Sequence, residues 1–221
     1  MLFKIYKMKQ QNFVFGSILC AIFSLTFVSC QSKTSEKDQK ETPIILKKEI
    51  ANDSAKDKQV QTPIIQLNDT TDPRAILLMV KDSASDVSRL SMKLAHIYTQ
   101  QLLPSIQKNN LTILGPPLAF YKSQRAPFFF EAGFQVNQIP RKKIKGIFTK
   151  QIGGTKAIVA NFYGPYEETE QAYVVLKEWL KEKGKKASGP AYEIYVDDPL
   201  DKDGKPKDPY QILTRIVMPY R

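Results

Sequence analysis

The feature that most constrains the fold is a stretch that occurs twice in the second half of the sequence. Residues 115–121 read Gly-Pro-Pro-Leu-Ala-Phe-Tyr, and residues 189–195 read Gly-Pro-Ala-Tyr-Glu-Ile-Tyr, 74 residues later. Each copy has the alternation of a β-strand and follows a segment with helical spacing. The repeat therefore predicts a domain built from two similar halves.

The elements around the two copies occur in the same order. Apolar side chains recur at intervals of three and four residues over 85–108 and again over 166–183, which predicts two helices. We expect Pro104 to kink the first helix or mark its last turn, and Gly184 to end the second. Further strands are expected at 76–80, 128–136, 157–163 and 212–218.

The resulting order is strand-helix-strand-strand, twice over. Such an order predicts an α+β fold in which two helices pack on one face of an antiparallel sheet. We place this domain at residues 74–221.

The start of the chain has the composition of an export signal. Three lysines precede an uncharged, mostly apolar run of 16 residues at positions 13–28. A bilayer span takes about 20 apolar residues, so we favour a signal segment over a membrane helix. We assign this segment to residues 1–29; its lysines are Lys4, Lys7 and Lys9.

The end of this run, Phe-Val-Ser-Cys at residues 27–30, resembles the lipobox of bacterial lipoproteins. The resemblance implies a lipid on Cys30 that anchors the chain in the bacterial cell envelope. Gln31 and Ser32 follow in place of the Asp that retains some lipoproteins in the inner membrane, so we expect the outer membrane. The alternative is an ordinary cleaved signal with Cys30 as a free or paired thiol.

Residues 30–73 are expected to form a disordered tether. Residues 31–73 are rich in charged and small polar residues and hold no glycine or aromatic residue, so they bury too little surface to offset the entropy of ordering. Thr-Pro-Ile-Ile occurs at 42–45 and again at 62–65. We interpret this echo as linker redundancy, with a weak docking strand as the alternative.

The positive charge of the chain belongs to the expected domain. The whole chain has 33 basic and 22 acidic residues, and residues 74–221 hold 23 of the basic and 14 of the acidic ones. The basic clusters at 141–145 and 181–186 lack interleaved aromatic residues that could stack on bases, so we expect no nucleic-acid partner. We interpret them as solvated surface, with attraction to anionic lipid headgroups as the alternative.

Composition also limits the chemistry. The chain has one histidine, His96, and two cysteines, too few for a histidine metal cage or a disulfide scaffold. The stretch 197–204 has the acidic spacing of a calcium loop, but aligning its glycine puts Tyr210 where a bidentate Glu belongs. We therefore expect no metal and no cofactor.

A single carboxylate is predicted at the centre of the domain. Glu193 and Tyr195 share one strand face, and Tyr121 is the counterpart of Tyr195 in the first copy. Ala119 stands where Glu193 would be, so a twofold arrangement of the halves would gather one acid and two tyrosines in one groove. We expect the helices to cover the other, apolar face, which carries Tyr192.

Several of these segments together resemble the GyrI-like small-molecule-binding domain, which also serves as the effector-binding module of AraC-type and MerR-type regulators. The resemblance covers about residues 75–221 and implies a ligand cleft between the halves, with an acidic residue among aromatic ones. Glu193 falls on the matching motif. The segments that carry the resemblance are 115–117, 130–133, 162–167, 172–173, 176–180, 192–195 and 198–199.

The candidate ligand-binding residues follow from the strand faces and this resemblance: Glu193, Tyr195, Tyr121, Tyr166, Tyr163, Phe162 and Trp179. For Tyr163 and Tyr166, which flank Gly-Pro, a purely structural turn is an equal alternative. For Phe162 and Trp179 we favour the hydrophobic core, and for Glu131 an edge charge rather than a second acid.

The hypothesis we favour is an anchored envelope lipoprotein that binds a small hydrophobic molecule, with a cation as the best match to a carboxylate among aromatic rings. One alternative is a hydrolase in which Glu193 activates water and Tyr195 or Tyr166 acts as the acid. Another is a protein-interaction module. Because no nucleophile and base pair is evident, we favour binding over catalysis and assign no catalytic residue.

Overall fold

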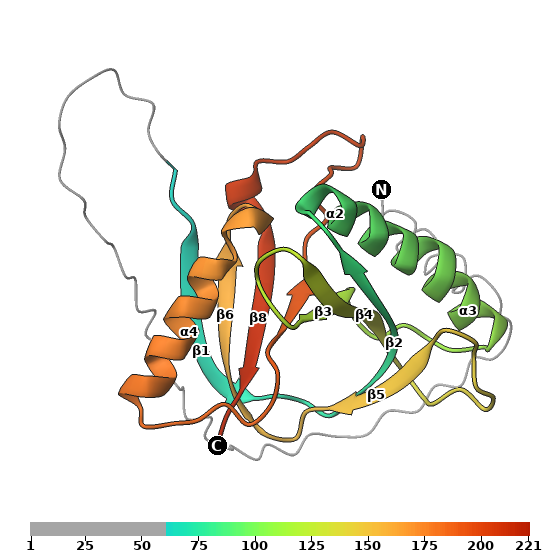
Figure 1. Cartoon of the computed structure of the whole chain (residues 1–221), viewed down its shortest axis with the longest axis horizontal. Coiled ribbons are helices and arrows are strands. Elements are labelled where there is room, and N and C mark those ends of the chain that lie inside the picture. The colour runs from blue at the N-terminus through green and yellow to red at the C-terminus, as the bar shows by residue number, and fades with distance from the viewer. Residues whose placement is uncertain (1–60) are drawn as a thin grey trace, which may run out of the picture.

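The computed structural model describes residues 61–221, which form one eight-stranded antiparallel sheet with helices on one face (Figure 1). The α+β class and the two helical segments on one face are confirmed. The strand order is β1-β6-β8-β7-β3-β4-β2-β5. The strands are β1 (Ile64–Thr71), β2 (Ala75–Ala84), β3 (Leu118–Tyr121), β4 (Phe128–Val136), β5 (Phe148–Ile152), β6 (Lys156–Tyr163), β7 (Tyr192–Tyr195) and β8 (Leu213–Pro219).

The two repeated stretches meet at the middle of the sheet. β3 and β7 pair antiparallel with Ala119 opposite Glu193, and Leu118 lies opposite Ile194. Since Ala119 and Glu193 are also counterparts at an offset of 74 residues, a pseudo-twofold axis passes through this pair. β4 and β2 continue the sheet on one side of the axis, as β8 and β6 do on the other.

The first strand of each half lies on the other half. β1, which precedes β2 in the chain, pairs along its whole length with β6, from Ile64 opposite Tyr163 to Thr71 opposite Lys156. β5, which precedes β6, pairs with β2. The strand at the outer edge beside β6 is therefore β1, which comes just before β2 in the chain. The strand at the opposite edge, beside β2, is β5, which comes just before β6.

The tether predicted for residues 30–73 is therefore wrong at its C-terminal end. The docking-strand alternative is the correct one for residues 62–65, because Ile64 and Ile65 begin β1. Alternate side chains of β1 stay exposed, while Ile65 and Leu67 pack on the core beneath α4. Residues 64–71 have the composition of a linker, but backbone pairing with β6 makes them a strand. The first copy of the echo, residues 42–45, lies outside the described residues.

The connections β1–β2 and β5–β6 pass each other closely. The backbone N–H of Gly154 donates to the carbonyl of Asp72 at 2.7 Å, and the N–H of Asp72 donates to the carbonyl of Thr155 at 2.9 Å. Gly153 has a φ of +83°, and a Cβ there would lie 1.9 Å from the carbonyl oxygen of Pro73. Only glycine fits this crossing.

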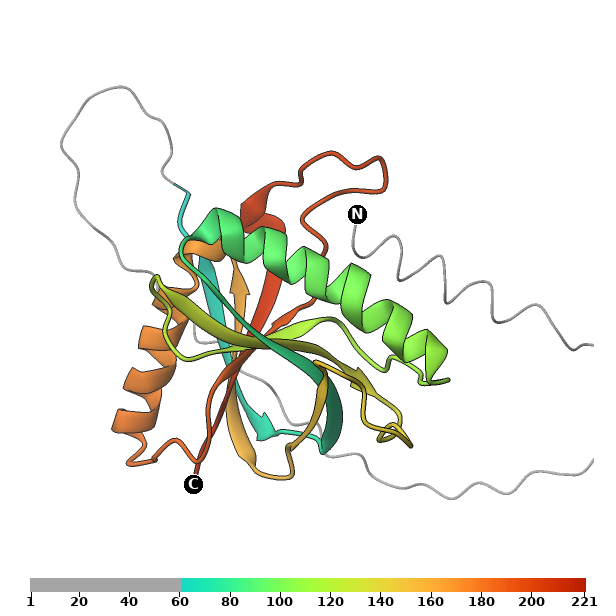
Figure 2. The same cartoon turned by 45° about the vertical axis from the view of Figure 1, so that its right-hand side comes forward.

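The first helical segment is one long rod with a π-turn in its middle (Figure 2). α2 (Val87–His96) is capped by Asp86, whose carboxylate accepts the N–H of Arg89 at 2.8 Å. The π-helix η1 (Ile97–Leu102) follows, and α3 (Leu103–Lys108) begins with Pro104 in its first turn. The kink or last turn predicted at Pro104 is replaced by a π-turn just before it, after which the helix continues to Lys108; a proline lacks the N–H that regular helical bonding requires.

The second helical segment starts with a short 3-10 turn, η2 (Tyr166–Glu168), and continues as α4 (Glu170–Glu182). Gly184 follows the helix with a φ of +61°, as predicted for its C-terminal cap. Ala172, Leu176 and Leu180 bury the apolar side of α4 against β6 and β8. A last 3-10 turn, η3 (Pro209–Gln211), precedes β8.

The helices cover the sheet face that carries Glu193, so the expectation that they cover the face of Tyr192 is wrong. The sheet curves strongly (Figure 1), and the side chains on its Tyr192 face pack on one another. The rings of Phe120 and Tyr192 lie 5.0 Å apart, and the Tyr192 hydroxyl donates to buried Asp72 at 2.7 Å. Because this face is filled by the curvature of the sheet, it needs no helix.

Within residues 61–221, no helix is long and apolar enough to cross a membrane. The expected signal segment 1–29, Cys30 and the tether up to residue 60 lie outside the described residues.

Candidate functional site

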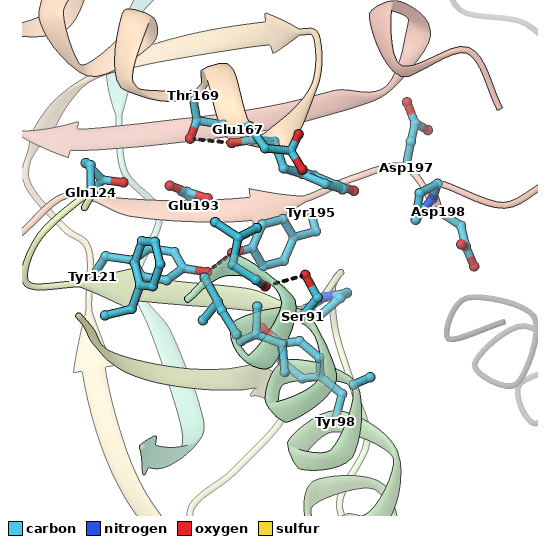
Figure 3. A pocket seen from close by; sticks show the side chains of 18 of the residues that line it. Ser91, Tyr98, Tyr121, Gln124, Glu167, Thr169, Glu193, Tyr195, Asp197 and Asp198 are labelled. Carbon is cyan, nitrogen blue, oxygen red and sulfur yellow. Dashed lines mark hydrogen bonds between the residues drawn. The ribbon is translucent and has the colours of Figure 1, made fainter. Parts of the chain in front are cut away.

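A cavity of about 500 Å³ lies between α2, the central strands β3 and β7, and the turn η2 (Figure 3). Its floor is the middle of the sheet, next to the pseudo-twofold axis. Its walls come from both halves of the domain, and the segment after β7 forms one end. The site thus depends on the complete duplicated fold.

Glu193 lies in the floor of this cavity and is only 4% exposed. Its Oε1 accepts a hydrogen bond from the hydroxyl of Tyr173 at 3.0 Å. The residue opposite, Ala119, is fully buried and has only a methyl group, which leaves space beside the carboxylate. Burial raises the pKa of Glu193 to about 7, while hydrogen bonds from Tyr173 and Tyr195 act in the opposite direction.

Tyrosines line the cavity beside this carboxylate (Figure 3). The hydroxyls of Tyr121 and Tyr195 are 2.5 Å apart, joining the two counterpart strands at the centre. The ring of Tyr166 stands edge-on to that of Tyr195 at 5.8 Å, and Tyr98 donates to the carbonyl of Leu118 at 2.9 Å. Burial raises the pKa of each of these four tyrosines above its usual value of 10, so their hydroxyls stay neutral at physiological pH.

The rim of the cavity is acidic. Glu167, Glu170, Asp197 and Asp198 line it together with the central Glu193, and none of the described lining residues is a lysine or an arginine. Asp197 and Asp198 lie at one end and Gln124 at the other (Figure 3). This is the reverse of the domain as a whole, whose net charge is positive. The cavity can therefore attract a cation but offers no counter-charge to an anion.

The wall opposite the sheet is apolar and comes from α2. Val87, Leu90 and Leu94 face the cavity, and α2 has no buried residue although it is amphipathic. Leu90 and Leu94 also pack partly against the hydrophobic core, whereas the fully buried residues of the rod begin at Ile97 and Tyr98. The helical stripe in the sequence thus packs on the core in its second half, and in its first half it contacts both the core and the cavity, a difference that periodicity does not reveal.

Of the candidate residues, Glu193, Tyr195, Tyr121 and Tyr166 line the cavity, and Tyr163, Phe162 and Trp179 do not. Phe162 is fully buried beneath α4, in the favoured core position. Trp179 packs on Tyr220 with ring centres 5.5 Å apart, and Tyr163 pairs with Ile64 at the end of β6.

Glu131 and the loop at residues 197–204 make structural contacts. They were considered above as a second acid and as a calcium loop. Glu131 is bound by Lys150 at 2.7 Å. The carboxylate of Asp201 accepts the backbone N–H groups of Asp203 and Lys205 within its own loop. Residues 61–221 contain no group of three or more potential ligand side chains arranged to hold a metal ion.

Sequence reasoning missed Tyr173, the partner of Glu193, and the acidic end at Asp197 and Asp198. Tyr173 lies next to Ala172 on the core side of α4, so its spacing indicates only burial. Its hydroxyl reaches Glu193 from a helix that packs on β6 and β8, so the contact depends on the tertiary fold.

Comparison with known proteins agrees with this architecture. Residues 120–221 match the family model of the GyrI-like small-molecule-binding domain. The C-terminal domain of EcmrR superposes with a TM-score of 0.54 at 20% identity, covering 73% of this chain and 99% of that domain. A hydrolase from Listeria innocua gives a TM-score of 0.50 at 14% identity, covering 70% of this chain and 91% of the other.

EcmrR bound to DNA in a transcription complex gives a TM-score of 0.54 at 18% identity over 74% of this chain, but this chain spans only 59% of its length. No curated protein sequence matches this one. At these identities the solved structures show a shared fold. The family match covers residues 120–221, and the solved structures agree with it in fold.

Proposed function

We propose that the domain binds a small lipophilic cation in this cavity, with Glu193 as its counter-ion. The observation that carries the proposal is a carboxylate with 4% exposure that has no basic partner among the described residues around it. A buried charge without a partner is costly, and a cationic ligand would remove that cost.

The rest of the cavity supports the same ligand class. Tyrosine rings can contribute about 0.5 to 2 kcal/mol each to a nearby cation. Leu90, Leu94 and Val87 offer apolar surface to the body of the molecule, and the acidic rim would raise the local concentration of cations. A volume of about 500 Å³ suits a ligand of a few fused or linked rings.

The test is a titration of the full chain in a neutral detergent with rhodamine 6G, a lipophilic cationic dye, followed by fluorescence anisotropy against a detergent-only blank. We expect saturable binding of one dye per chain. Fluorescein, an anionic dye with a similar ring system, serves as the control and should not saturate. Equal binding of the two dyes, or no saturation with rhodamine 6G, would contradict the proposal.

The structure gives less support to hydrolysis, the function named for the Listeria innocua relative in fold. Burial raises the pKa of Tyr166 and Tyr195, which makes both hydroxyls weak proton donors at neutral pH. Glu193 also shares its carboxylate with the Tyr173 hydroxyl. We therefore propose binding rather than turnover.

We also propose that the chain is a lipoprotein of the bacterial outer membrane, anchored through Cys30. The support is the order of basic residues, apolar run and Phe-Val-Ser-Cys at residues 27–30, all within the first thirty residues. Mass spectrometry of the chain expressed in a bacterium with two membranes should find an acylated Cys30 as the N-terminus, in the outer-membrane fraction. A Cys30→Ala variant should lose the acyl mass; an N-terminus without lipid in the unsubstituted chain would refute the anchor.

A further inference from the structure

A second hollow, a groove of about 720 Å³, lies beside the cavity on the α4 side. It runs between α4 and the β3–β4 connection, and Tyr121, Gln124 and Glu170 line both hollows. Tyr173, whose hydroxyl donates to Glu193, also lines the groove.

The two hollows are counterparts under the pseudo-twofold axis. At the offset of 74 residues, residues 121–125 of the groove correspond to residues 195–199, and Ala191 corresponds to Pro117 of the cavity. The duplicated fold has therefore produced one hollow next to each long helix.

The charge of the groove is opposite to that of the cavity. Ser123 and Gln124 stand at the positions that correspond to Asp197 and Asp198. Five basic residues line the groove against a single acid, Glu170, which binds Arg125 at 2.7 Å. The basic residues are Lys122, Arg125, Lys177, Lys181 and Lys185.

Two of these lysines repel each other, and three have no acidic partner in the described part of the chain. Lys177 and Lys181 are four residues apart on the same face of α4, where like charges repel. The helix dipole favours a lysine in the last turn, but it does not account for Lys122 on a different element. Among the described residues, no carboxylate lies within salt-bridge distance of Lys122, Lys177 or Lys181.

Apolar surface accompanies this charge. Val174 lies on the same side of α4 as Lys177 and is 47% exposed. Leu180, Ala191 and Met218 continue the apolar lining toward the sheet. A charged group held by the lysines could thus place a hydrocarbon tail along this surface.

We propose that the groove is a second binding site, for an amphiphilic anion: a phosphate or carboxylate that carries a short hydrocarbon tail. The site is distinct from the acidic cavity, because the lysines line only the groove and Glu193 lines only the cavity.

The test is isothermal titration calorimetry of the full chain in neutral detergent with hexyl phosphate, whose short tail prevents micelles. We expect one saturable site, tenfold or more weakened in a Lys177→Gln, Lys181→Gln double variant. The matched control is Lys142→Gln with Lys143→Gln, which removes the same charge from exposed residues outside both hollows and should change affinity less than twofold. Circular dichroism verifies that both variants are folded.

Equal losses in the two double variants, or hexanol binding as tightly as hexyl phosphate, would overturn the proposal. Glu193→Gln separates this proposal from the preceding one, since it should weaken rhodamine 6G binding about 100-fold and leave hexyl phosphate binding intact. Dihexanoyl phosphatidylglycerol identifies the source of the anion: tighter binding than hexyl phosphate supports a lipid headgroup, and weaker binding supports a free anion.

Discussion

Replacing Glu193 with glutamine is expected to weaken the binding of rhodamine 6G about 100-fold. Removing one partner of a buried ion pair costs about 2 to 5 kcal/mol, and each 1.4 kcal/mol is a factor of ten in affinity. Glutamine keeps the size of the side chain and can still accept the hydroxyl hydrogen bond of Tyr173. The loss would therefore report the charge rather than the shape of the cavity, and fluorescence anisotropy measures it.

The matched control is Glu167→Gln, which removes one acid from the exposed rim of the same cavity. Solvent screens an exposed charge, so its removal should cost about threefold or less. Similar losses in the two variants would show that the cavity attracts cations through the summed charge of its acidic residues and not through an ion pair with Glu193. The assignment of Glu193 as the counter-ion would then be wrong.

The affinity for rhodamine 6G should fall about 100-fold between pH 8 and pH 5. The pKa of Glu193 is raised by burial to about 7, so below that pH the carboxyl is neutral and cannot pair with a cation. Affinity should fall about tenfold per pH unit below 7 and level off above it. At pH 6 the binding of one cation should also release close to one proton, which calorimetry in buffers of different ionisation enthalpy detects.

The Glu193→Gln variant gives the baseline for this profile, because it keeps every other titratable group around the cavity. Its affinity should change little over the same pH range. A profile with the same slope in the variant would place the titrating group elsewhere.

The same ionisation should lower the stability of the empty protein. Because the folded pKa of Glu193 lies above the ordinary value of 4.5, the folded state holds its proton more tightly than the unfolded state. The contribution of Glu193 to the free energy of unfolding should therefore fall as pH rises from 4.5 to 7, by about 3 kcal/mol in all. Urea denaturation at pH 8 should find Glu193→Gln more stable than the unsubstituted chain, an opposite effect to its loss of binding.

The duplicated core of the fold could be predicted because it follows from local patterns. The offset between the two Gly-Pro stretches gives the pairing of Ala119 with Glu193, and alternation places Tyr195 on the face of the carboxylate. These features depend only on strand period and on symmetry between the halves.

The strands at the sheet edges could not be predicted in this way. β1 is half polar, and its order comes from backbone hydrogen bonds to β6, nearly a hundred residues later. β5 is a short strand, and nothing in its own composition indicates that it pairs with β2. In both cases the partner, rather than the segment itself, determines the structure.

The sequence could not predict which face of the sheet the helices cover, or that α2 lines the cavity, because both depend on the assembled fold. A stripe of apolar residues in α2 shows that the helix meets an apolar surface, but it does not show that Leu90 and Leu94 line a cavity as well as packing on the core. The curvature of the sheet, which fills its Tyr192 face without a helix, likewise arises only once all eight strands are assembled.

The crossed placement of β1 and β5 has a consequence for how such a domain can be divided. Either half, produced alone, would carry a leading strand with nowhere to dock and a sheet lacking its outer edge. Only another copy of the same half could supply what is missing, and that homodimer would contain two identical hollows. When both halves lie in a single polypeptide, the residues of the two hollows can differ. Here one hollow is acidic and the other is basic.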